Sequence, residues 1–438
     1  MSNTLSENLE RALDALRRLH PKKIDLGLER IERVLEKLGR PQDRLPPIVH
    51  IAGTNGKGST IAYLRAFSEA QGLKAHVYTS PHLVHFRERI IVGSREIEDG
   101  YLIDILARVR QANGDAPLSF FEATTAAMFL AFSEQPADIA LIEVGLGGRF
   151  DATNVIEPDC TAITPIDYDH AEFLGKDLAT IARTKAGIMK RHCPVFIGPQ
   201  SELTNAVLEN EAIKVGANAY FWNQDFRAYS QHGRLVYQPA DNLLDLPPPA
   251  LLGNHQISNA GLAIAIARNL QISDPAITKG LTQVSWPARM QNLTTGPLAE
   301  KVIQTGGELW LDGGHNPHAA RAIANTMAEL EARVSRPLIL ITGILANKDI
   351  EGFLEAYEGL TKTLIGVPIP GHESLDLNRL TGLANQRAMT GYIAKNITDA
   401  LDIALESVTS ERANPTPRIL ICGSLYLAGE VLKLSAKP

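Results

Sequence analysis

The stretch IVHIAGTNGKGST, residues Ile48 to Thr60, restricts the fold more than any other part of this sequence. It opens with five mostly apolar residues typical of a buried strand and continues with three glycines, one lysine and three hydroxyl side chains. The next residues, IAYLRAFSEA, are typical of a helix. A glycine-rich turn between strand and helix can bind an anion, because its N–H groups curl around the charge and the helix N-terminus adds partial positive charge. We therefore expect a phosphate loop in which Lys57 contacts the β and γ phosphates.

The loop departs from the strict phosphate-loop pattern GxxxxGK[ST]. Ile51 occupies the position of the first glycine, and Gly58 follows the lysine. A turn with a purely structural role is the alternative, but the lysine, the hydroxyls and the helix that follows favour phosphate binding. We expect the loop and its lysine to be exposed. The residues expected around the phosphates are Gly53, Thr54, Asn55, Gly56, Lys57, Gly58 and Ser59.

Length and charge limit the possible classes of protein. A chain of 438 residues is too long for one hydrophobic core, so we expect two domains. The net charge is 43 − 49 = −6, with no long basic run, which argues against nucleic-acid or membrane-surface binding. The three cysteines are far apart and form no CxxC, so neither a disulfide framework nor a structural zinc site is expected. Because there is no stretch of about 18 apolar residues and no apolar signal core at the N-terminus, we expect a cytoplasmic protein without membrane spans.

Strand-like and helical stretches alternate along most of the chain. The runs DIALIEV, CTAIT and PVFIG read as strands and residues 122–132 as a helix, which indicates a parallel sheet covered on both faces. Residues 219–238 alternate and are rich in aromatics, so we expect a small antiparallel piece there. After WPARMQNLTTG the chain starts again with ELWLDGG, PLILITGI, TLIGVPI and RILICGS, four further strands. We expect two α/β domains: residues 1–295 with a P-loop-type parallel-sheet ATPase fold, and the smaller, Rossmann-like residues 296–438.

A string of motifs makes the chain resemble a known family. The motifs are IDLGLERI, GTNGKGS, TSPHL, EVGLGGRFDATN, DH followed by LG, KAGI, LDGGHNPHA and CGSLYLAGE, and they extend from about residue 24 to residue 430. In this order they resemble folylpolyglutamate synthase and bifunctional dihydrofolate synthase of the Mur ligase superfamily. The resemblance implies an ATP-dependent ligase of folate biosynthesis and one-carbon metabolism.

Acidic and basic side chains near strand ends suggest a metal site. Glu143 ends a strand, where ligands of parallel sheets gather and where a carboxylate suits Mg²⁺, although a capping or salt-bridged glutamate is the alternative. His170 alone is more typical of a packed or surface residue. The resemblance implies that Ser80 and Glu143 bind a first Mg²⁺ and His170 a second. It also implies that Lys185, otherwise a plain lysine, is carbamylated and helps to orient the second ion.

Residues of the second half of the chain would complete the ATP site. Arg289 presents a planar fork that suits phosphate oxygens, although a solvated arginine in a linker is an equal alternative. The resemblance implies that Arg289 and Asp312 contact ATP and that His315 lies near the γ-phosphate. It matches Asn259 to an asparagine near the adenine. ATP would then be bound by both domains, and their closure would exclude water.

The acceptor pocket is expected within the first domain. Adjacent aromatics are usually core residues, but an aromatic ring can also stack on a flat pterin. The resemblance implies that Ser119, Phe121, Asp151 and Ala152 line a pteroate pocket and that the segment around His20 covers it. Asp151 can accept hydrogen bonds from paired N–H donors, and the alternative is an Asx turn in a glycine-rich loop.

The expected reaction joins L-glutamate to an acid through an acyl phosphate. The substrates that the resemblance implies are dihydropteroate or folate, L-glutamate and ATP with two Mg²⁺ ions, and we expect a monomer. Lys57, Lys185 and His315 are the expected catalytic residues. Three alternatives remain open: a monofunctional folylpolyglutamate synthase, a Mur-type ligase acting on a cell-wall precursor, and a nucleotide-binding regulator without ligase activity. A pure regulator gains little from a second metal, which argues against the last of these.

Overall fold

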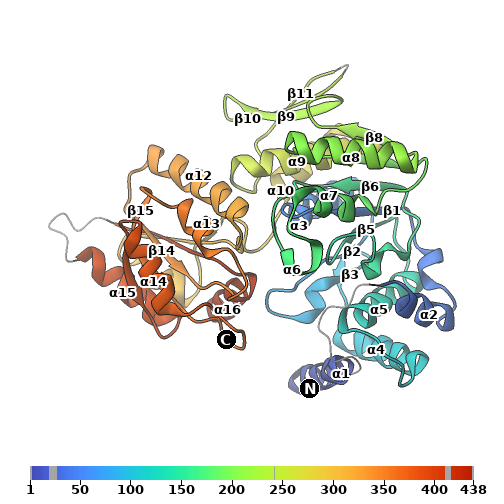
Figure 1. Ribbon diagram of the computed structural model, residues 1–438, viewed down its shortest axis with the longest axis horizontal. Coiled ribbons are helices and arrows are strands. Elements are labelled where there is room, and N and C mark those ends of the chain that lie inside the picture. The colour runs from blue at the N-terminus through green and yellow to red at the C-terminus, as the bar shows by residue number, and fades with distance from the viewer. Residues whose placement is uncertain (1, 19–26, 241, 410–415, 437–438) are drawn as a thin grey trace. The chain divides into compact units, whose positions relative to one another are not determined.

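The computed structural model describes residues 2–18, 27–240, 242–409 and 416–436. The chain forms two compact units (Figure 1). Unit 1 comprises Met1–Ala250 and Ile257–Val284, and unit 2 comprises Leu251–Gln256 and Ser285–Pro438. Within the described ranges, none of the helices combines the length and the apolar composition that a membrane crossing requires.

Unit 1 is built on an eight-stranded sheet with the order β4-β3-β2-β5-β1-β6-β7-β8. The strands pair in parallel except for β3 and β4, which are antiparallel at one edge. Because β1 lies between β5 and β6, the carboxyl ends of these three strands are neighbours. The strands are β1 (Ile48–Ala52), β2 (Ala75–Tyr78), β3 (Ile90–Val92), β4 (Arg95–Glu96), β5 (Ile139–Glu143), β6 (Cys160–Ile163), β7 (Pro194–Ile197) and β8 (Asn218–Phe221).

Helices bury the sheet of unit 1 in separate hydrophobic clusters (Figure 1). One cluster joins α1, α2, α4 and α5 to strands β1, β2 and β5, and another joins α7 and α8 to β6 and β7. The helices are α1 (Ser2–Arg17), α2 (Glu29–Lys37), α3 (Lys57–Ala70), α4 (Asp99–Asn113), α5 (Phe120–Glu134), α6 (Ala171–Leu174), α7 (Leu178–Ala186), α8 (Glu202–Val215), α9 (Asn254–Asn269) and α10 (Asp274–Gln283). Three short 3₁₀ helices are η1 (Pro41–Arg44), η2 (Phe86–Arg89) and η3 (Ala152–Val155). The predicted parallel sheet covered by helices is confirmed.

A small antiparallel sheet follows β8. Its strands are β9 (Phe226–Gln231), β10 (Arg234–Pro239) and β11 (Leu244–Leu246), in the order β11-β10-β9. The two-residue turn between β9 and β10 consists of His232 and Gly233, with φ of 51° and 76°. Positive φ at both positions is the geometry of a type I′ turn, which fits the twist of a hairpin. The antiparallel piece expected near residues 219–238 is therefore present, but β8, which lies at the start of that range, joins the large sheet instead.

Unit 2 contains a six-stranded sheet with the order β12-β13-β17-β14-β15-β16, in which only β12 pairs antiparallel. The four expected strands are β13 (Glu308–Leu311), β14 (Leu338–Thr342), β15 (Thr361–Gly366) and β17 (Arg418–Cys422). Strands β12 (Gln291–Leu293) and β16 (Thr390–Ile393) were not predicted from the sequence. Both lie at sheet edges, where short, partly exposed strands carry little of the apolar signal. The helices are α11 (Pro297–Ile303), α12 (Pro317–Arg333), α13 (Ile350–Glu355), α14 (Leu377–Gln386), α15 (Ile397–Thr409) and α16 (Leu425–Ser435).

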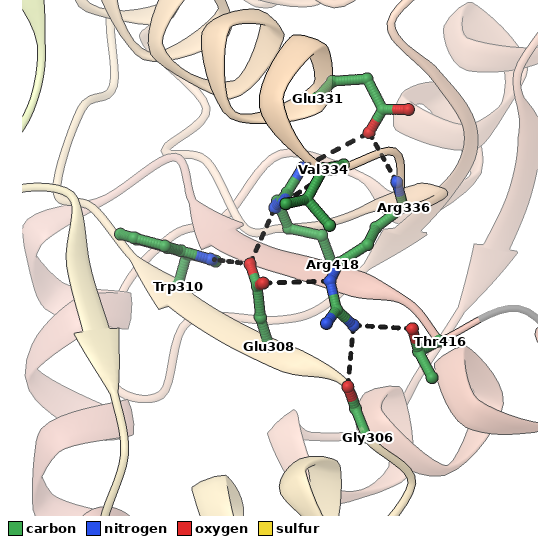
Figure 2. Close-up of polar contacts among 8 residues, drawn as sticks. All are labelled: Gly306, Glu308, Trp310, Glu331, Val334, Arg336, Thr416 and Arg418. Atoms are coloured by element: carbon green, nitrogen blue, oxygen red, sulfur yellow. Dashed lines mark hydrogen bonds and ion pairs between the residues drawn. The ribbon is translucent and has the colours of Figure 1, made fainter.

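An ion-pair network closes the amino-terminal edge of this second sheet, as Figure 2 shows. Arg418 begins β17 and is only 2% exposed. Its Nε atom donates to Glu308 Oε2 at 2.9 Å, its Nη1 lies 3.4 Å from Glu331 Oε2, and its Nη2 donates to the Val334 carbonyl. Glu308 begins β13, and Glu331 and Val334 lie at the end of α12 and just after it. One arginine therefore ties two strands and a helix together.

Candidate active site

The phosphate loop connects β1 to α3, and two of its glycines have no room for a side chain. Gly53 has φ of 147°, and a Cβ atom there would lie 1.8 Å from Thr164 Oγ1. Gly56 has φ of 91°, and its Cβ would lie 2.4 Å from Asn259 Oδ1. Only glycine combines these backbone angles with such close approach. The loop is therefore packed against the segment after β6 and against α9, and Asn259 contacts the loop itself.

Two of the loop N–H groups already have acceptors within the fold. The N–H groups of Thr54 and Asn55 donate to the carbonyl of Pro165 at 3.0 and 3.3 Å. The hydroxyl of Thr54 donates to the Asp167 carbonyl at 2.9 Å and accepts from the Asp167 N–H at 3.1 Å. These bonds tie the loop to the segment after β6. The N–H groups that point along a helix axis are those of the first turn of α3, which begins at Lys57, so an anion would be bound there.

Lys57 lies where the ends of β1 and β5 meet. Its Nζ atom is 3.2 Å from the carbonyl oxygens of both Gly53 and Thr54 and 3.8 Å from Glu143 Oε1. Its side chain is 17% exposed. The lysine therefore folds back over its own loop, so it is less exposed than the sequence analysis expected. A positive charge is nevertheless held at the start of α3, where the helix N-terminus adds to it.

Glu143 and Ser80 are neighbours at the carboxyl edge of the sheet. Glu143 is the last residue of β5, is 5% exposed, and accepts a hydrogen bond from the Ser80 N–H at 3.2 Å. Ser80 follows β2, the strand beside β5. Among the described residues, no group of three or more histidines, cysteines or acids could hold a metal ion. One carboxylate with a nearby hydroxyl fits Mg²⁺, which takes few protein oxygens and retains several waters.

Lys185 is buried beside the same loop. It lies in α7, is 4% exposed, and its Nζ donates to the Gly53 carbonyl at 2.8 Å, although the two residues are 132 positions apart. Burial and, to a smaller extent, the positive charge of Lys57 lower the pKa of Lys185 to about 7, against the opposing effect of the negative charges of Asp169 and Asp151. An amine with such a pKa is uncharged in a large share of molecules near neutral pH, which is the form that reacts with CO₂.

His170 lies on the segment between β6 and α6, with an exposed side chain and a φ of 52°. Its Nε2 atom is 3.9 Å from Asp169 Oδ1. Asp169 is the residue of this segment whose charge acts on Lys185, and the sequence analysis did not single it out. The signal that could have found it is the second aspartate of DYDH, which precedes the histidine.

The expected acceptor residues Ser119 and Phe121 lie at the start of α5. Ser119 caps this helix: its hydroxyl accepts from the Glu122 N–H, and its own N–H donates to Glu122 Oε2 at 2.7 Å. Arg30 of α2 donates to both oxygens of Glu122 at 2.9 and 3.0 Å. The ring of Phe121 packs on Gly145, where a Cβ would lie 2.2 Å from the ring. The start of α5 is thus fixed by a partly buried arginine–carboxylate pair that was not predicted from the sequence.

Asp151 is buried and already accepts several hydrogen bonds. Its Oδ1 atom accepts from the Thr153 N–H at 3.0 Å and from the Thr153 hydroxyl at 2.6 Å, and its Oδ2 accepts from the Leu146 N–H at 2.7 Å. Burial raises the pKa of Asp151, and these hydrogen bonds oppose the change. The Asx turn left open as an alternative is therefore present, and Ala152 is buried just after it. His20, expected to cover this pocket, lies outside the described residues.

Unit 2 brings Arg289, Asp312 and His315 together at the carboxyl end of β13. Asp312 accepts from the N–H groups of Met290 and Gly314 at 2.7 Å each. Burial raises the pKa of Asp312, whereas the positive charges of Arg289 and His315 act on this carboxyl group and lower its pKa. His315 Nδ1 is 3.0 Å from the Gly313 carbonyl. The helix expected near Pro317 begins there as α12.

The backbone around Arg289 adopts an unusual conformation. Ala288 and Met290, on either side of it, have φ of 54° and 42°, and both are buried. Left-handed conformations are rare for residues other than glycine and cost about 1 kcal/mol or more each. The Arg289 Nη1 atom donates to the Ala288 carbonyl at 2.8 Å. A strained backbone thus fixes the position of the Arg289 Cα atom. The sequence WPARMQ gave no sign of this strain.

Comparison with known proteins agrees with this arrangement. The Mur ligase middle domain family matches residues 51–267, and the Mur ligase glutamate ligase domain family matches residues 299–425. This chain belongs to the Mur ligase family. Its curated relatives include the dihydrofolate synthase/folylpolyglutamate synthase of Escherichia coli, 31% identical over 96% of this chain and 94% of the relative. The folylpolyglutamate synthase of Lacticaseibacillus casei is 32% identical over 92% of each chain. The predicted family is confirmed.

Solved structures of Mur ligases have the same fold as this chain. Escherichia coli FolC in complex with DHPP and ADP has a TM-score of 0.85 at 30% identity, covering 97% of both chains. Mycobacterium tuberculosis folylpolyglutamate synthase complexed with ADP has a TM-score of 0.85 at 29% identity, covering 99% of both chains. A bifunctional synthase with Mn, AMPPNP and L-glutamate bound has a TM-score of 0.84 at 30% identity. The predicted fold and the predicted enzyme class, an ATP-dependent ligase that uses a divalent metal, are confirmed for this family.

Proposed function

We propose that this chain is an ATP-dependent ligase that adds L-glutamate to dihydropteroate and to folates. The observation that carries the proposal is the convergence of Lys57, Lys185, Glu143 and Ser80 at the carboxyl edge of one parallel sheet. The carbonyl of Gly53 contacts both lysine amines, at 3.2 and 2.8 Å, and Glu143 lies 3.8 Å from Lys57. The Lys57 cation and a carboxylate that can hold a metal ion, both beside a helix N-terminus, are suited to a polyphosphate. Relatives with this name support the choice of acceptor.

The proposed reaction has two steps. A carboxylate oxygen of the acceptor attacks the γ-phosphorus of ATP, its bond to the bridging oxygen breaks, and ADP and an acyl phosphate form. The α-amine of L-glutamate then attacks the acyl carbon, phosphate leaves, and the amine loses a proton to give the amide. Lys57 would stabilise negative charge on the transferred phosphoryl group from unit 1. Arg289 and His315 would stabilise phosphate charge from unit 2, and Asp312 would hold Arg289.

The proposed reaction uses two Mg²⁺ ions. Ser80 and Glu143 would hold the first and His170 the second. When bound, the ions supply positive charge that lets two anions, a phosphate and a carboxylate, approach each other. Asn259 would contact ATP near the adenine. We further propose that residues 1–295 contain ATP and pteroate binding, with Ser119, Phe121, Asp151 and Ala152 in the acceptor pocket, and that residues 296–438 form a glutamate-ligase domain. The enzyme would act as a cytoplasmic monomer on small-molecule substrates.

A turnover assay tests the function directly. The purified chain is incubated with ATP, Mg²⁺, L-glutamate and either dihydropteroate or tetrahydrofolate, and phosphate and the amide product are measured. Turnover with both acceptors is expected. Turnover with tetrahydrofolate alone would indicate a monofunctional folylpolyglutamate synthase. Turnover only with a UDP-linked cell-wall precursor would assign a different Mur-type reaction, and ATP binding without any amide would indicate a regulator.

Replacing His170 with alanine is expected to lower kcat by about a hundredfold while changing the affinity for ATP by less than about threefold. The reason is that charge stabilisation by a second ion would act mainly in the transition state, where several kcal/mol are available. Steady-state kinetics and ADP binding by calorimetry give the two values. His192→Ala is the matched control, because His192 is also exposed and also has a positive φ, 61°. A His170→Ala enzyme that lost only ATP binding would contradict the proposed role.

Replacing Lys185 with alanine is expected to lower turnover by about two orders of magnitude, with partial recovery on addition of formate or acetate. We propose that the neutral amine of Lys185 attacks CO₂, loses a proton and becomes a carbamate, so that a small carboxylate can replace part of it. The burial of the amine and its lowered pKa of about 7 support this. ¹³C NMR with labelled bicarbonate is expected to give a carbamate signal in the wild type. Persistence of that signal in Lys185→Ala would disprove the assignment, and Lys190→Ala is the control.

A further inference from the structure

A chain of three buried polar side chains leads from the central strand of unit 1 to Asp151. His50 lies within β1, opposite Ile142 of β5 and Thr161 of β6, and is completely buried. Its Nε2 atom is 2.8 Å from Thr153 Oγ1, although the two residues are 103 positions apart. The Thr153 hydroxyl is 2.6 Å from Asp151 Oδ1. Of these three residues, the sequence predicted a role in the acceptor pocket for Asp151 alone.

The chemistry of the three groups fixes the direction of the hydrogen bonds. An ionised carboxylate only accepts, so the proton of the Thr153 hydroxyl points at Asp151. The hydroxyl oxygen then accepts from His50, whose Nε2 must carry the proton. Burial lowers the pKa of His50 to about 3, with a smaller contribution from the charge of Lys190, so the ring is neutral and has a single N–H. The chain therefore runs from His50 through Thr153 to Asp151.

This direction limits how Asp151 can bind a ligand. Thr153 supplies two donors to Oδ1, its N–H at 3.0 Å and its hydroxyl at 2.6 Å. Oδ2 accepts from Leu146 at 2.7 Å. A carboxylate offers about four acceptor positions, so the positions not used by these donors are few and their direction is set by Thr153. The carboxyl group is thereby held in one rotamer, and the hydrogen bonds oppose the rise of its pKa on burial.

The position of His50 is costly in a purely structural protein core. The other residues of β1 are Ile48, Val49, Ile51 and Ala52, all buried and apolar. Within the described residues, the Nδ1 atom of His50 is buried and has no hydrogen-bond partner. Leaving a buried acceptor unsatisfied costs about 1–3 kcal/mol, which an apolar side chain at this position would avoid. A function of the Nε2–H group accounts for the presence of a histidine here.

We propose that His50 and Thr153 are positioning residues for the acceptor pocket: His50 orients the Thr153 hydroxyl, and Thr153 orients the Asp151 carboxyl group, which accepts from an N–H donor of a flat heteroaromatic acceptor. The inference rests on the proposed function, in which dihydropteroate is the acceptor. Its recognition would thus depend on a residue in the middle of β1, the strand that leads into the phosphate loop. Neither residue contacts the reacting atoms.

The test compares Thr153→Val, which removes the hydroxyl at nearly constant volume, with Thr153→Ser, which retains it. Binding of dihydropteroate and of ADP is measured separately by calorimetry, and KM and kcat are measured for both substrates. Thr153→Val is expected to weaken dihydropteroate binding by about tenfold, the effect of losing one hydrogen bond to a charged group, with ADP binding changed by less than twofold. Thr153→Ser is expected to restore binding to within about threefold. Equal weakening of both ligands, or no recovery in the serine variant, would overturn the inference.

A second measurement is independent of ligands. Long-range ¹H–¹⁵N NMR of histidine rings, with His50 assigned from the signal lost in His50→Gln, is expected to give the neutral Nε2–H tautomer. The opposite tautomer would disprove the chain even if dihydropteroate is bound. His76→Gln serves as the control, because His76 is a buried histidine on β2 whose Nε2 contacts the Gln135 carbonyl instead. If the wild type binds ADP but not dihydropteroate, the proposed acceptor is wrong and this inference falls with it.

Discussion

Replacing Lys57 with alanine is expected to reduce ATP turnover by about 10²–10³-fold, which is typical for the loss of one preorganised group that stabilises transferred charge. Lys57 begins α3, and its amine is held 3.2 Å from two loop carbonyls and 3.8 Å from Glu143. No other residue of the loop GTNGKGS carries a positive charge. Phosphate release in the presence of acceptor and glutamate measures the effect.

The fold is expected to tolerate this substitution. The lysine amine contacts backbone carbonyls and one carboxylate, and Glu143 keeps its hydrogen bond from Ser80, so the loss in unfolding free energy should be about 1 kcal/mol. Lys214→Ala is the matched control, because Lys214 also pairs with a glutamate of low exposure, Glu211, at 2.7 Å but far along the chain in α8. Near-normal turnover in a folded Lys57→Ala enzyme would remove Lys57 from the mechanism.

Replacing Arg418 with alanine is expected to destabilise unit 2 by about 2–3 kcal/mol, because a buried guanidinium loses hydrogen bonds to charged groups. The guanidinium is 2% exposed and contacts Glu308, Glu331 and the Val334 carbonyl (Figure 2). Its loss removes these contacts, whereas Arg336 and Trp310 keep theirs to Glu308. Hydrogen exchange of peptides from β13 and β17, followed by mass spectrometry, reports the local stability. The matched control is Arg234→Ala: Arg234 pairs with Asp245 at 2.7 Å, but both side chains are about half exposed, so about 0–1 kcal/mol is expected.

The same network gives this prediction a pH dependence. Burial by itself would raise the pKa of Glu308, but hydrogen bonds from Arg418 and Trp310 outweigh it and hold that pKa below its usual value. A carboxyl with a lowered pKa in the folded state adds stability above its unfolded pKa and loses it as the pH falls through the folded pKa. The difference between wild type and Arg418→Ala should therefore shrink below about pH 4. If the stability difference between wild type and Arg418→Ala is the same at pH 7 and at pH 3, the ion pair is not the source of that difference.

The sequence predicted those features that local patterns encode. Apolar runs marked β1, β5, β6 and β7 and the four inner strands of unit 2, because buried parallel strands are continuously apolar. The edge strands β12 and β16 were not predicted, because they are short and partly exposed. The glycine loop was recognised because its strand, turn and helix are contiguous. The hydrogen bonds of its N–H groups could not be predicted, because Pro165, the acceptor for two of them, lies more than a hundred residues away.

By itself the sequence therefore determined the order of strands and helices, the phosphate loop and the family, because each depends on residues close together in the chain or on motifs read in order. Only the tertiary structure decided which distant groups meet. β1 pairs with β5 and β6 rather than with β2, which follows it, and this strand order places Lys185 on Gly53 and His50 on Thr153. Such contacts follow from sheet topology and packing, in which side chains from separate strands and helices share one buried volume, and no local pattern records that pairing.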